Sequence, residues 1–287
     1  MDFIVDTNLF YYLSDGWISR ADIGGATDDL FISPIVILEL ISGLDRSNAQ
    51  YRRKIFETIA HNNIRLVPDP ETWIVTRANA KLTQEPFDWQ LLLDAMRTVV
   101  TYDDVRQAML YWPPPGTRPM RTRWLDIRLA NSWNARHEKD WRENLEATLK
   151  RYVPNTNEWF STKSGPRPKM PSSLKRIVGP VLNHDNMLDD IAAGLALRLL
   201  PLSGDGVNLN PASTRSVADT YIRIFRQYLI DILLKQSVPK ENDRWDIEFF
   251  LYLGAPGTRF ATAEPRWENV AKDAGFPSAV KRILIES

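Results

Sequence analysis

The fold class is decided by the opening stretch of the chain, Asp2-Phe-Ile-Val-Asp6-Thr7-Asn8. Apolar residues flanked by aspartates are typical of a short buried strand, here one that ends at Asp6. Beyond it, apolar periodicity after Ser33-Pro34 predicts a helix over 34–44, and a second helical pattern covers 49–60. Residues 64–67 have the pattern of another strand. This order of strand, helix, helix and strand predicts an α/β unit with a parallel sheet.

The end of the chain has the same α/β character. Asn242 is a suitable N-cap for a helix that ends at Gly254. Residues 258–262 have the pattern of a short strand, and residues 265–274 that of a further helix. We therefore expect both ends of the chain to contribute to one sheet.

The middle of the chain differs from its ends, because helical stripes dominate residues 70–235. The clearest stripe is the apolar one between Val217 and Leu233. We predict an α/β domain made of residues 1–69 and 236–287, split by a mainly α-helical insertion over 70–235. Formal charge follows this division, with −4 on the first part, +5 on the insertion and −1 on the last part.

Composition limits the chemistry. The chain has 287 residues, of which 44% are hydrophobic, and its 36 basic and 36 acidic side chains balance. This balance excludes a globally basic surface but not a local basic patch. Cysteine is absent, which excludes disulfides, thiolate metal sites and cysteine nucleophiles. With only 3 histidines, carboxylates must carry most of any chemistry.

No apolar run approaches the roughly 18 residues that a membrane span requires. The N-terminus has no basic region of the kind that begins a secretory signal. We therefore expect no membrane partner and a cytoplasmic location.

Two acidic residues in the first part lie at informative positions. Asp6 follows a strand, and active sites of open parallel sheets form at the carboxyl ends of strands. A helix N-cap or turn residue is the simpler explanation for one such aspartate. Glu39 lies inside the apolar stretch Ile35–Ile41, where burial of a carboxylate is costly unless a cation compensates it. The alternative places Glu39 on the solvated face of a helix.

Further acids lie near the end of the chain. Asp243 and Asp246 are three residues apart and can share one face of a helix, although acidic residues are also common at helix starts. Glu264 follows the strand that ends at Thr262. Carboxylates that converge on one cleft repel each other unless cations lie between them, and their oxygens suit Mg²⁺ or Mn²⁺. Two such ions about 4 Å apart can activate water and stabilise the leaving oxygen of a phosphodiester.

Four segments, in this order along the chain, carry a family resemblance: Phe3-Ile-Val-Asp6-Thr7-Asn8, Ser33-Pro-Ile-Val-Ile-Leu-Glu39-Leu, Asn242-Asp243-Arg-Trp-Asp246 and Phe260-Ala-Thr262-Ala-Glu264. Together they resemble the motifs of PIN-domain ribonucleases. The resemblance implies a three-layer α/β/α fold around a central parallel sheet. It also implies an acidic Mg²⁺ or Mn²⁺ site that cleaves single-stranded RNA with metal-activated water.

By this resemblance, the catalytic and metal-binding acids are Asp6, Glu39, Asp243 or Asp246, and Glu264. Asn8 and Thr262 take supporting roles. The chain departs from the family pattern in two ways. Glu264 stands where the family usually has aspartate, and the insertion is larger than the domain that it interrupts. The fold and role of the insertion are therefore not implied by the resemblance.

Two stretches of the insertion lack acidic residues and combine basic with aromatic side chains. Basic residues neutralise phosphates, and aromatic rings stack on unpaired bases. Solvated loops with tryptophans facing the core explain the same pattern. The candidate nucleic-acid-binding residues are Arg118, Arg121, Arg123, Lys163, Arg167 and Lys169.

The first hypothesis is therefore a metal-dependent endonuclease for single-stranded RNA. The alternative is a catalytically inactive PIN-like scaffold that binds RNA or a protein partner. A haloacid dehalogenase-type phosphatase is set aside, because that chemistry requires an aspartate where this chain has Asn8. The residues are compatible with a toxin of a toxin–antitoxin pair, a defence effector or an RNA-processing enzyme. They are equally compatible with a monomer or a homodimer, and with a protein inhibitor or regulatory partner.

Overall fold

The computed structural model of the chain describes residues 1–41, 44, 46–83, 88–97, 172, 176, 179–180, 184–203, 209–234 and 243–285. Five strands form one all-parallel sheet with the order β3-β2-β1-β4-β5. The strands are β1 (Asp2–Val5), β2 (Asp29–Ile32), β3 (Arg65–Leu66), β4 (Thr258–Thr262) and β5 (Val280–Arg282). A parallel sheet combined with many helices agrees with the predicted α/β class.

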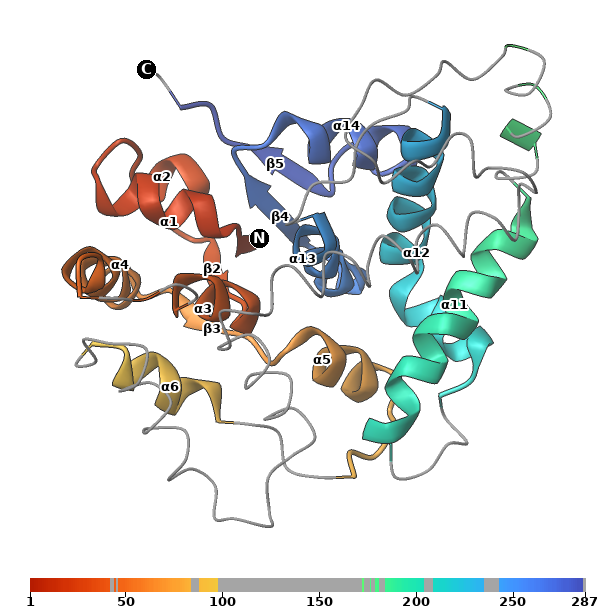
Figure 1. Cartoon of the computed structure of the whole chain (residues 1–287), viewed down its shortest axis with the longest axis horizontal. Helices are drawn as coiled ribbons and strands as arrows, with labels where there is room; N and C mark the ends of the chain where they lie inside the picture. The colour runs from red at the N-terminus through yellow and green to blue at the C-terminus, as the bar shows by residue number, and fades with distance from the viewer. Residues whose placement is uncertain are drawn as a thin grey trace.

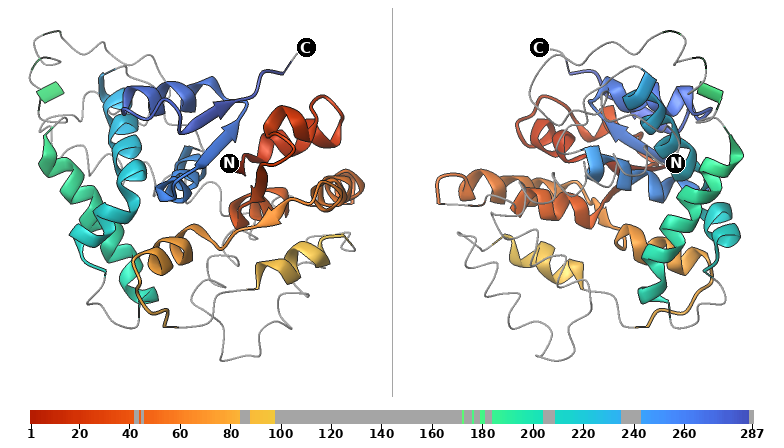
Figure 2. Two further views of the ribbon diagram at one scale, coloured as in Figure 1. Left: turned by 180° about the vertical axis from the view of Figure 1, so that it is seen from behind. Right: turned by 45° about the vertical axis from the view of Figure 1, so that its right-hand side comes forward.

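Helices precede, connect and follow these strands along the chain. The first part contains α1 (Thr7–Ser14), α2 (Arg20–Ile23), α3 (Pro34–Ile41) and α4 (Ala49–His61). The middle contains α5 (Pro70–Arg77), α6 (Trp89–Ala95), α11 (Asp185–Leu199), the 3₁₀ helix η2 (Leu200–Leu202) and α12 (Pro211–Leu234). The last part contains α13 (Asp243–Glu248), the 3₁₀ helix η3 (Phe249–Gly254) and α14 (Pro265–Asp273). Figures 1 and 2 show α1–α4 on one side of the strands and α11, α12 and α14 on the other.

The two neighbouring strands β1 and β4 come from opposite ends of the chain. Val5 pairs with Ala261, and the N–H of Asp6 donates to the Ala261 carbonyl at 2.9 Å. From β1 the chain proceeds outward to β2 and β3, whereas from β4 it proceeds in the opposite direction to β5. Ligands of open α/β sheets bind at the carboxyl ends of strands where the strand order reverses in this way. In this protein that position lies beyond Val5 and Thr262.

Most of the elements predicted from the sequence are confirmed. Strand β4 covers 258–262 as predicted, and β1 ends one residue before Asp6. Helices α3, α4, α12 and α14 lie where apolar periodicity placed them, and α13 continues into η3 as far as Gly254. The proposed cap Asn242 lies outside the described residues.

The sequence patterns did not predict α1, β2 or β5. Strand β2 has 4 residues and runs directly into Ser33-Pro34, so its apolar residues were not separated from the helix that follows. Helix α1 contains aromatic residues of modest helix propensity. Its formation depends instead on burial, because Leu9 and Phe10 are completely buried against the core. Tertiary packing therefore outweighs local preference in this segment.

Helices of the middle segment pack directly against the C-terminal part. Helix α12 contacts η3, α13 and α14, and α5 contacts η3. In the core beneath them, the rings of Phe249 and Phe260 stack with their centroids 5.0 Å apart. The boundaries predicted at 69/70 and 235/236 stay predictions, because packing contacts alone do not define domains.

An ion-pair cluster also joins three of these helices. Arg198 of α11 donates two hydrogen bonds of 2.6 Å to Glu248 of α13, and a third of 2.7 Å to Glu71 of α5. The carboxylate of Glu248 is buried, so the bidentate guanidinium contact supplies the charge that this burial requires. Among the described residues, no helix is long and apolar enough to cross a membrane.

Candidate acidic site

Asp6 lies at the reversal of strand order and is 3% exposed. It occupies the N-cap position of α1, but its side chain makes no capping hydrogen bond. The carboxylate instead accepts a hydrogen bond of 2.6 Å from the Thr262 hydroxyl at the end of β4. The same hydroxyl oxygen accepts a bond of 3.1 Å from the backbone N–H of Glu264. Thr262 therefore connects the first acid to the backbone of the last one.

Glu39 and Glu264 are the partly exposed acids of this region. Every other residue of α3 is buried, so Glu39 is the one position of that helix that reaches the surface. The hydroxyl of Thr7 donates a hydrogen bond to the Glu39 carboxylate. Glu264 occupies the N-cap position of α14, and its side chain makes no capping bond there. Both acids can therefore face a ligand that approaches from solvent.

The structure distinguishes the two aspartates of α13. Arg266 donates a hydrogen bond of 2.6 Å to one oxygen of Asp243, and the Tyr228 hydroxyl donates one of 3.0 Å to the other. A cation therefore compensates the charge of Asp243. Asp246 instead accepts a bond of 3.1 Å from the indole N–H of Trp267, which is a neutral donor. The negative charge of Asp246 stays uncompensated by that contact.

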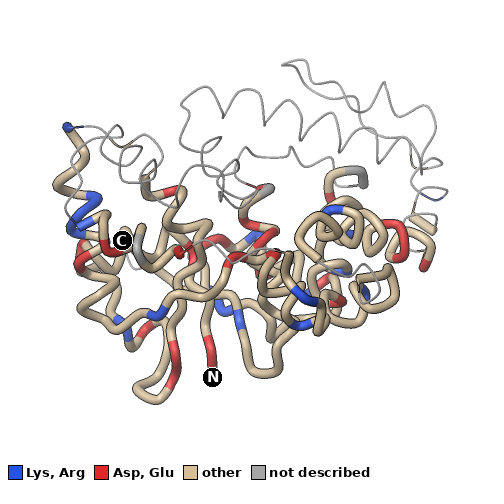
Figure 3. The backbone as a smooth tube through the Cα atoms, turned by 90° about the horizontal axis from the view of Figure 1, so that it is seen from below, with Lys and Arg blue, Asp and Glu red and all other residues tan. Residues whose placement is uncertain are grey.

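The pKa of Asp246 is affected by the charges of the acids near the strand ends. Burial, together with the charges of Glu39 and Glu264, raises the pKa of Asp6 to about 7, although the Thr262 hydroxyl opposes this rise. Burial raises the pKa of Asp246 well above its usual range, and the charges of Asp6, Glu39 and Glu264 add to the effect. No basic side chain is among the largest influences on either pKa. Figure 3 shows several acidic positions gathered near the middle of the described fold.

We call Asp6, Glu39, Asp246 and Glu264 the acidic cluster. Its donor set consists only of carboxylate oxygens, which are the ligands that Mg²⁺ and Mn²⁺ prefer. Its mutual repulsion is of the kind that a bound cation relieves. Within the described part of the chain, however, no group of three or more Asp, Glu or His side chains already surrounds a common metal position. The fit to a metal therefore rests on charge and ligand chemistry and not on a preformed cage.

The other predicted site residues have different surroundings. Asn8 is exposed in the first turn of α1, and no hydrogen bond joins it to Asp6 in the described residues. The six predicted nucleic-acid-binding residues, from Arg118 to Lys169, lie outside the described residues. His184 caps α11 by accepting a bond from the backbone N–H of Asn186.

Sequence reasoning missed four residues that contact the acids. Thr7 and Trp267 donate directly to the cluster, and Tyr228 and Arg266 hold Asp243. Thr7 and Trp267 lie close to Asp6 and Glu264 in the sequence, and this proximity was the available signal. Tyr228 falls within the apolar stripe predicted between Val217 and Leu233. A tyrosine in such a stripe can place its ring in the core and its hydroxyl on a polar partner.

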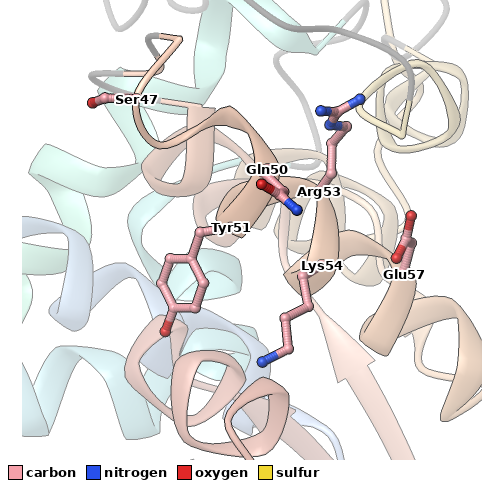
Figure 4. Close-up of a pocket in the computed structure, with 6 residues that line it drawn as sticks. All are labelled: Ser47, Gln50, Tyr51, Arg53, Lys54 and Glu57. Carbon is pink, nitrogen blue, oxygen red and sulfur yellow. The ribbon is translucent and has the colours of Figure 1, made fainter.

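A separate pocket of about 530 Å³ lies on α4. Figure 4 shows the six residues that line it, Ser47, Gln50, Tyr51, Arg53, Lys54 and Glu57. None of them belongs to the acidic cluster. Tyr51 and Lys54 both donate hydrogen bonds to Asp15, so part of the polar lining is already used within the protein.

Comparison of the chain with models of known protein families, with curated proteins and with solved structures found no match.

Proposed function

We propose that the protein is a metal-dependent endonuclease that hydrolyses phosphodiester bonds of single-stranded RNA at the acidic cluster. The observation that carries this proposal is that burial and the charges of neighbouring carboxylates raise the pKa values of Asp6 and Asp246 where the strand order reverses. Neutral donors hold Asp6 and Asp246, whereas an arginine neutralises Asp243. We therefore assign metal binding to Asp6, Glu39, Asp246 and Glu264, and a supporting role to Asp243.

The topology supports a PIN-like three-layer arrangement within this proposal. Crossovers between parallel strands are right-handed in nearly all proteins. The connections from β1 to β3 run in one direction along the sheet, and that from β4 to β5 runs in the other. Right-handed crossovers then place α1, α3 and α4 on one face and α14 on the opposite face. This is the layering that the family resemblance implies.

The proposed chemistry divides between the ion and the protein. A bound Mg²⁺ or Mn²⁺ supplies activation of water and stabilisation of charge on the phosphodiester. The chain itself supplies the ligands and fixes their orientation by hydrogen bonds. Thr7 donates to Glu39, Thr262 to Asp6 and Trp267 to Asp246. The partly exposed Glu39 and Glu264 leave the cluster open to a nucleic acid. Arg118, Arg121, Arg123, Lys163, Arg167 and Lys169 remain the proposed phosphate contacts.

Cleavage of a labelled single-stranded RNA in Mn²⁺, Mg²⁺ or EDTA tests the proposal. Asp6→Asn and Asp246→Asn each remove one charge at almost constant volume, and we expect each to reduce cleavage at least about 100-fold, in line with the loss of an essential catalytic group. The matched control is Asp219→Asn. Asp219 is a partly exposed residue that forms an ion pair with Arg223 within α12, so this variant should retain wild-type activity.

Three results would contradict the proposal in different ways. Cleavage that persists in EDTA would exclude a role for the metal in the reaction. Wild-type cleavage rates in both Asp6→Asn and Asp246→Asn would exclude a catalytic role for these two acids. A folded wild-type protein that fails to cleave RNA in Mn²⁺ and in Mg²⁺ would favour the inactive scaffold instead.

A further inference from the structure

Tyr228 in α12 is a side chain of the middle segment that bonds directly to Asp243 of α13. Tyr228 is completely buried, and its ring stacks on Trp267 of α14 with the centroids 5.9 Å apart. The guanidinium of Arg266 lies 5.1 Å from the centre of the Tyr228 ring and 5.3 Å from that of Trp267. The three side chains thus pack as one unit, with contributions from two helices.

This unit holds both aspartates of α13. The Tyr228 hydroxyl and Arg266 bond to the two different oxygens of Asp243, so the carboxylate is fixed in position and orientation. Trp267 bonds to Asp246. Positions 243 and 246 share one face of the helix, so any rotation of α13 about its axis that breaks one bond also displaces the other. Asp243 is 1% exposed, and its loss of partners would leave a buried charge uncompensated.

We propose that Tyr228 is a positioning residue of the metal site, whose hydroxyl holds Asp243 and thereby fixes the rotation of α13 that presents Asp246 to Asp6. This inference rests on the function proposed above. It gives α12, a helix of the predicted insertion, a defined part in assembling the site. Burial and the charge of Asp243 raise the pKa of Tyr228, so the hydroxyl retains the proton that it donates.

Calorimetric titration of the purified chain with Mn²⁺ tests this role without reference to cleavage. Tyr228→Phe removes the hydroxyl and keeps the ring that stacks on Trp267. Loss of a group that orients metal ligands typically weakens metal affinity about 10- to 100-fold, and we expect a loss in that range. Cleavage by the same variant should recover at saturating Mn²⁺, because all four acids of the cluster remain.

The matched control is Tyr252→Phe. Tyr252 is equally buried, and its hydroxyl donates to the Pro68 carbonyl at 2.8 Å and pairs with the Ser33 hydroxyl at 3.0 Å, so these two hydroxyl partners are not acids. A purely structural effect would lower thermal stability similarly in both variants and leave both Mn²⁺ affinities unchanged. We expect the affinity to fall in Tyr228→Phe alone.

A second variant, Arg266→Lys, keeps the positive charge opposite Asp243 but loses the planar guanidinium group. It should therefore also weaken Mn²⁺ binding. If Tyr228→Phe fails to fold, Arg266→Lys still tests whether the hold on Asp243 sets Mn²⁺ affinity, on which the role of Tyr228 depends. Wild-type affinity in every variant that folds would overturn the positioning role while leaving the proposed function intact. A wild-type chain that binds no Mn²⁺ would overturn the proposed function, and the positioning role with it.

Discussion

Thr262 shows how one side chain can join distant parts of the sequence at the site. Its hydroxyl donates to Asp6, 256 residues away, and accepts from the N–H of Glu264. Because the donor to Asp6 is neutral, it orients the carboxylate without removing the cost of its charge. The cost is visible in the raised pKa of Asp6, for which burial is the leading cause. A ligand that requires the negative charge of Asp6 would explain why a residue that destabilises the fold when charged is present here.

This cost predicts an unusual dependence of stability on pH. The pKa of Asp6 is about 7 in the folded chain, above the value of about 3.9 for an unfolded aspartate. The folded state therefore binds more protons between these values, so the contribution of Asp6 to stability falls as pH rises from about 4 to about 7. Asp6→Asn removes the titrating group. In EDTA, the free energy of unfolding of the variant should exceed that of wild type by about 1 to 4 kcal/mol at pH 8. At about pH 4 the two free energies of unfolding should be nearly equal.

Urea unfolding in EDTA at several pH values measures this difference. Added Mn²⁺ at pH 8 should then stabilise wild type more than Asp6→Asn, because the ion compensates the charge that the variant lacks. A variant that is less stable than wild type at pH 8 would show that the Asp6 charge is already satisfied within the protein.

The residue-scale limits of sequence reasoning are clear from α13. The spacing of Asp243 and Asp246 placed both on one face of a helix, but could not say which one a cation would neutralise. That distinction depends on Arg266 and Tyr228, which meet Asp243 only after α12 and α14 have packed. A local pattern contains no information about such a partner.

At the scale of elements, the close approach of η3 to α12 limits what position 254 can hold. The sequence identified Gly254 as a helix end, and η3 does end there. The structure adds a packing reason, because a Cβ at this position would lie 2.3 Å from the backbone carbonyl oxygen of Val217 and 2.9 Å from Arg77. A backbone atom cannot rotate away, so the two elements would have to separate.

We therefore expect Gly254→Ala to lower the free energy of unfolding by about 1 to 3 kcal/mol. Gly194→Ala is the matched control, since Gly194 lies within α11 and a Cβ there would meet nothing within 4 Å. The control should stabilise the protein by about 0.5 to 1 kcal/mol through helix propensity. Chemical denaturation of both variants measures the difference. Equal effects of the same sign would show that α12 and η3 do not pack as described.

Helices with a strong period were predicted well, and so were the short strands β1 and β3, whereas the short strands β2 and β5 were not. Helices α4 and α12 bury one side, so their patterns are readable in the sequence alone. Strands β2 and β5 have 4 and 3 residues, which is too few to establish a period. Their existence depends on pairing with β1 and β4, which are remote in the sequence.

At the scale of the whole molecule, the two chain ends meet in one sheet. The pairing of β1 with β4 brings Asp6 next to Thr262. The same pairing places Glu264 and Asp6 at the same edge of the sheet, where both strands end. The helices between them are not remote from this site, because α12 contacts both α13 and α14. Folding of the middle segment and formation of the acidic cluster are therefore expected to depend on each other.

Anomalous diffraction from crystals of the chain grown or soaked with Mn²⁺ locates the metal ion relative to the acidic cluster. We expect a Mn²⁺ peak at the ends of β1 and β4, with carboxylate oxygens of Asp6 and Asp246 as ligands at about 2.0 to 2.4 Å and Glu39 or Glu264 beside them. Asp243 should stay paired with Arg266. A Mn²⁺ peak on Asp243 instead, or no peak at the cluster at saturating Mn²⁺, would contradict the assignment of this site.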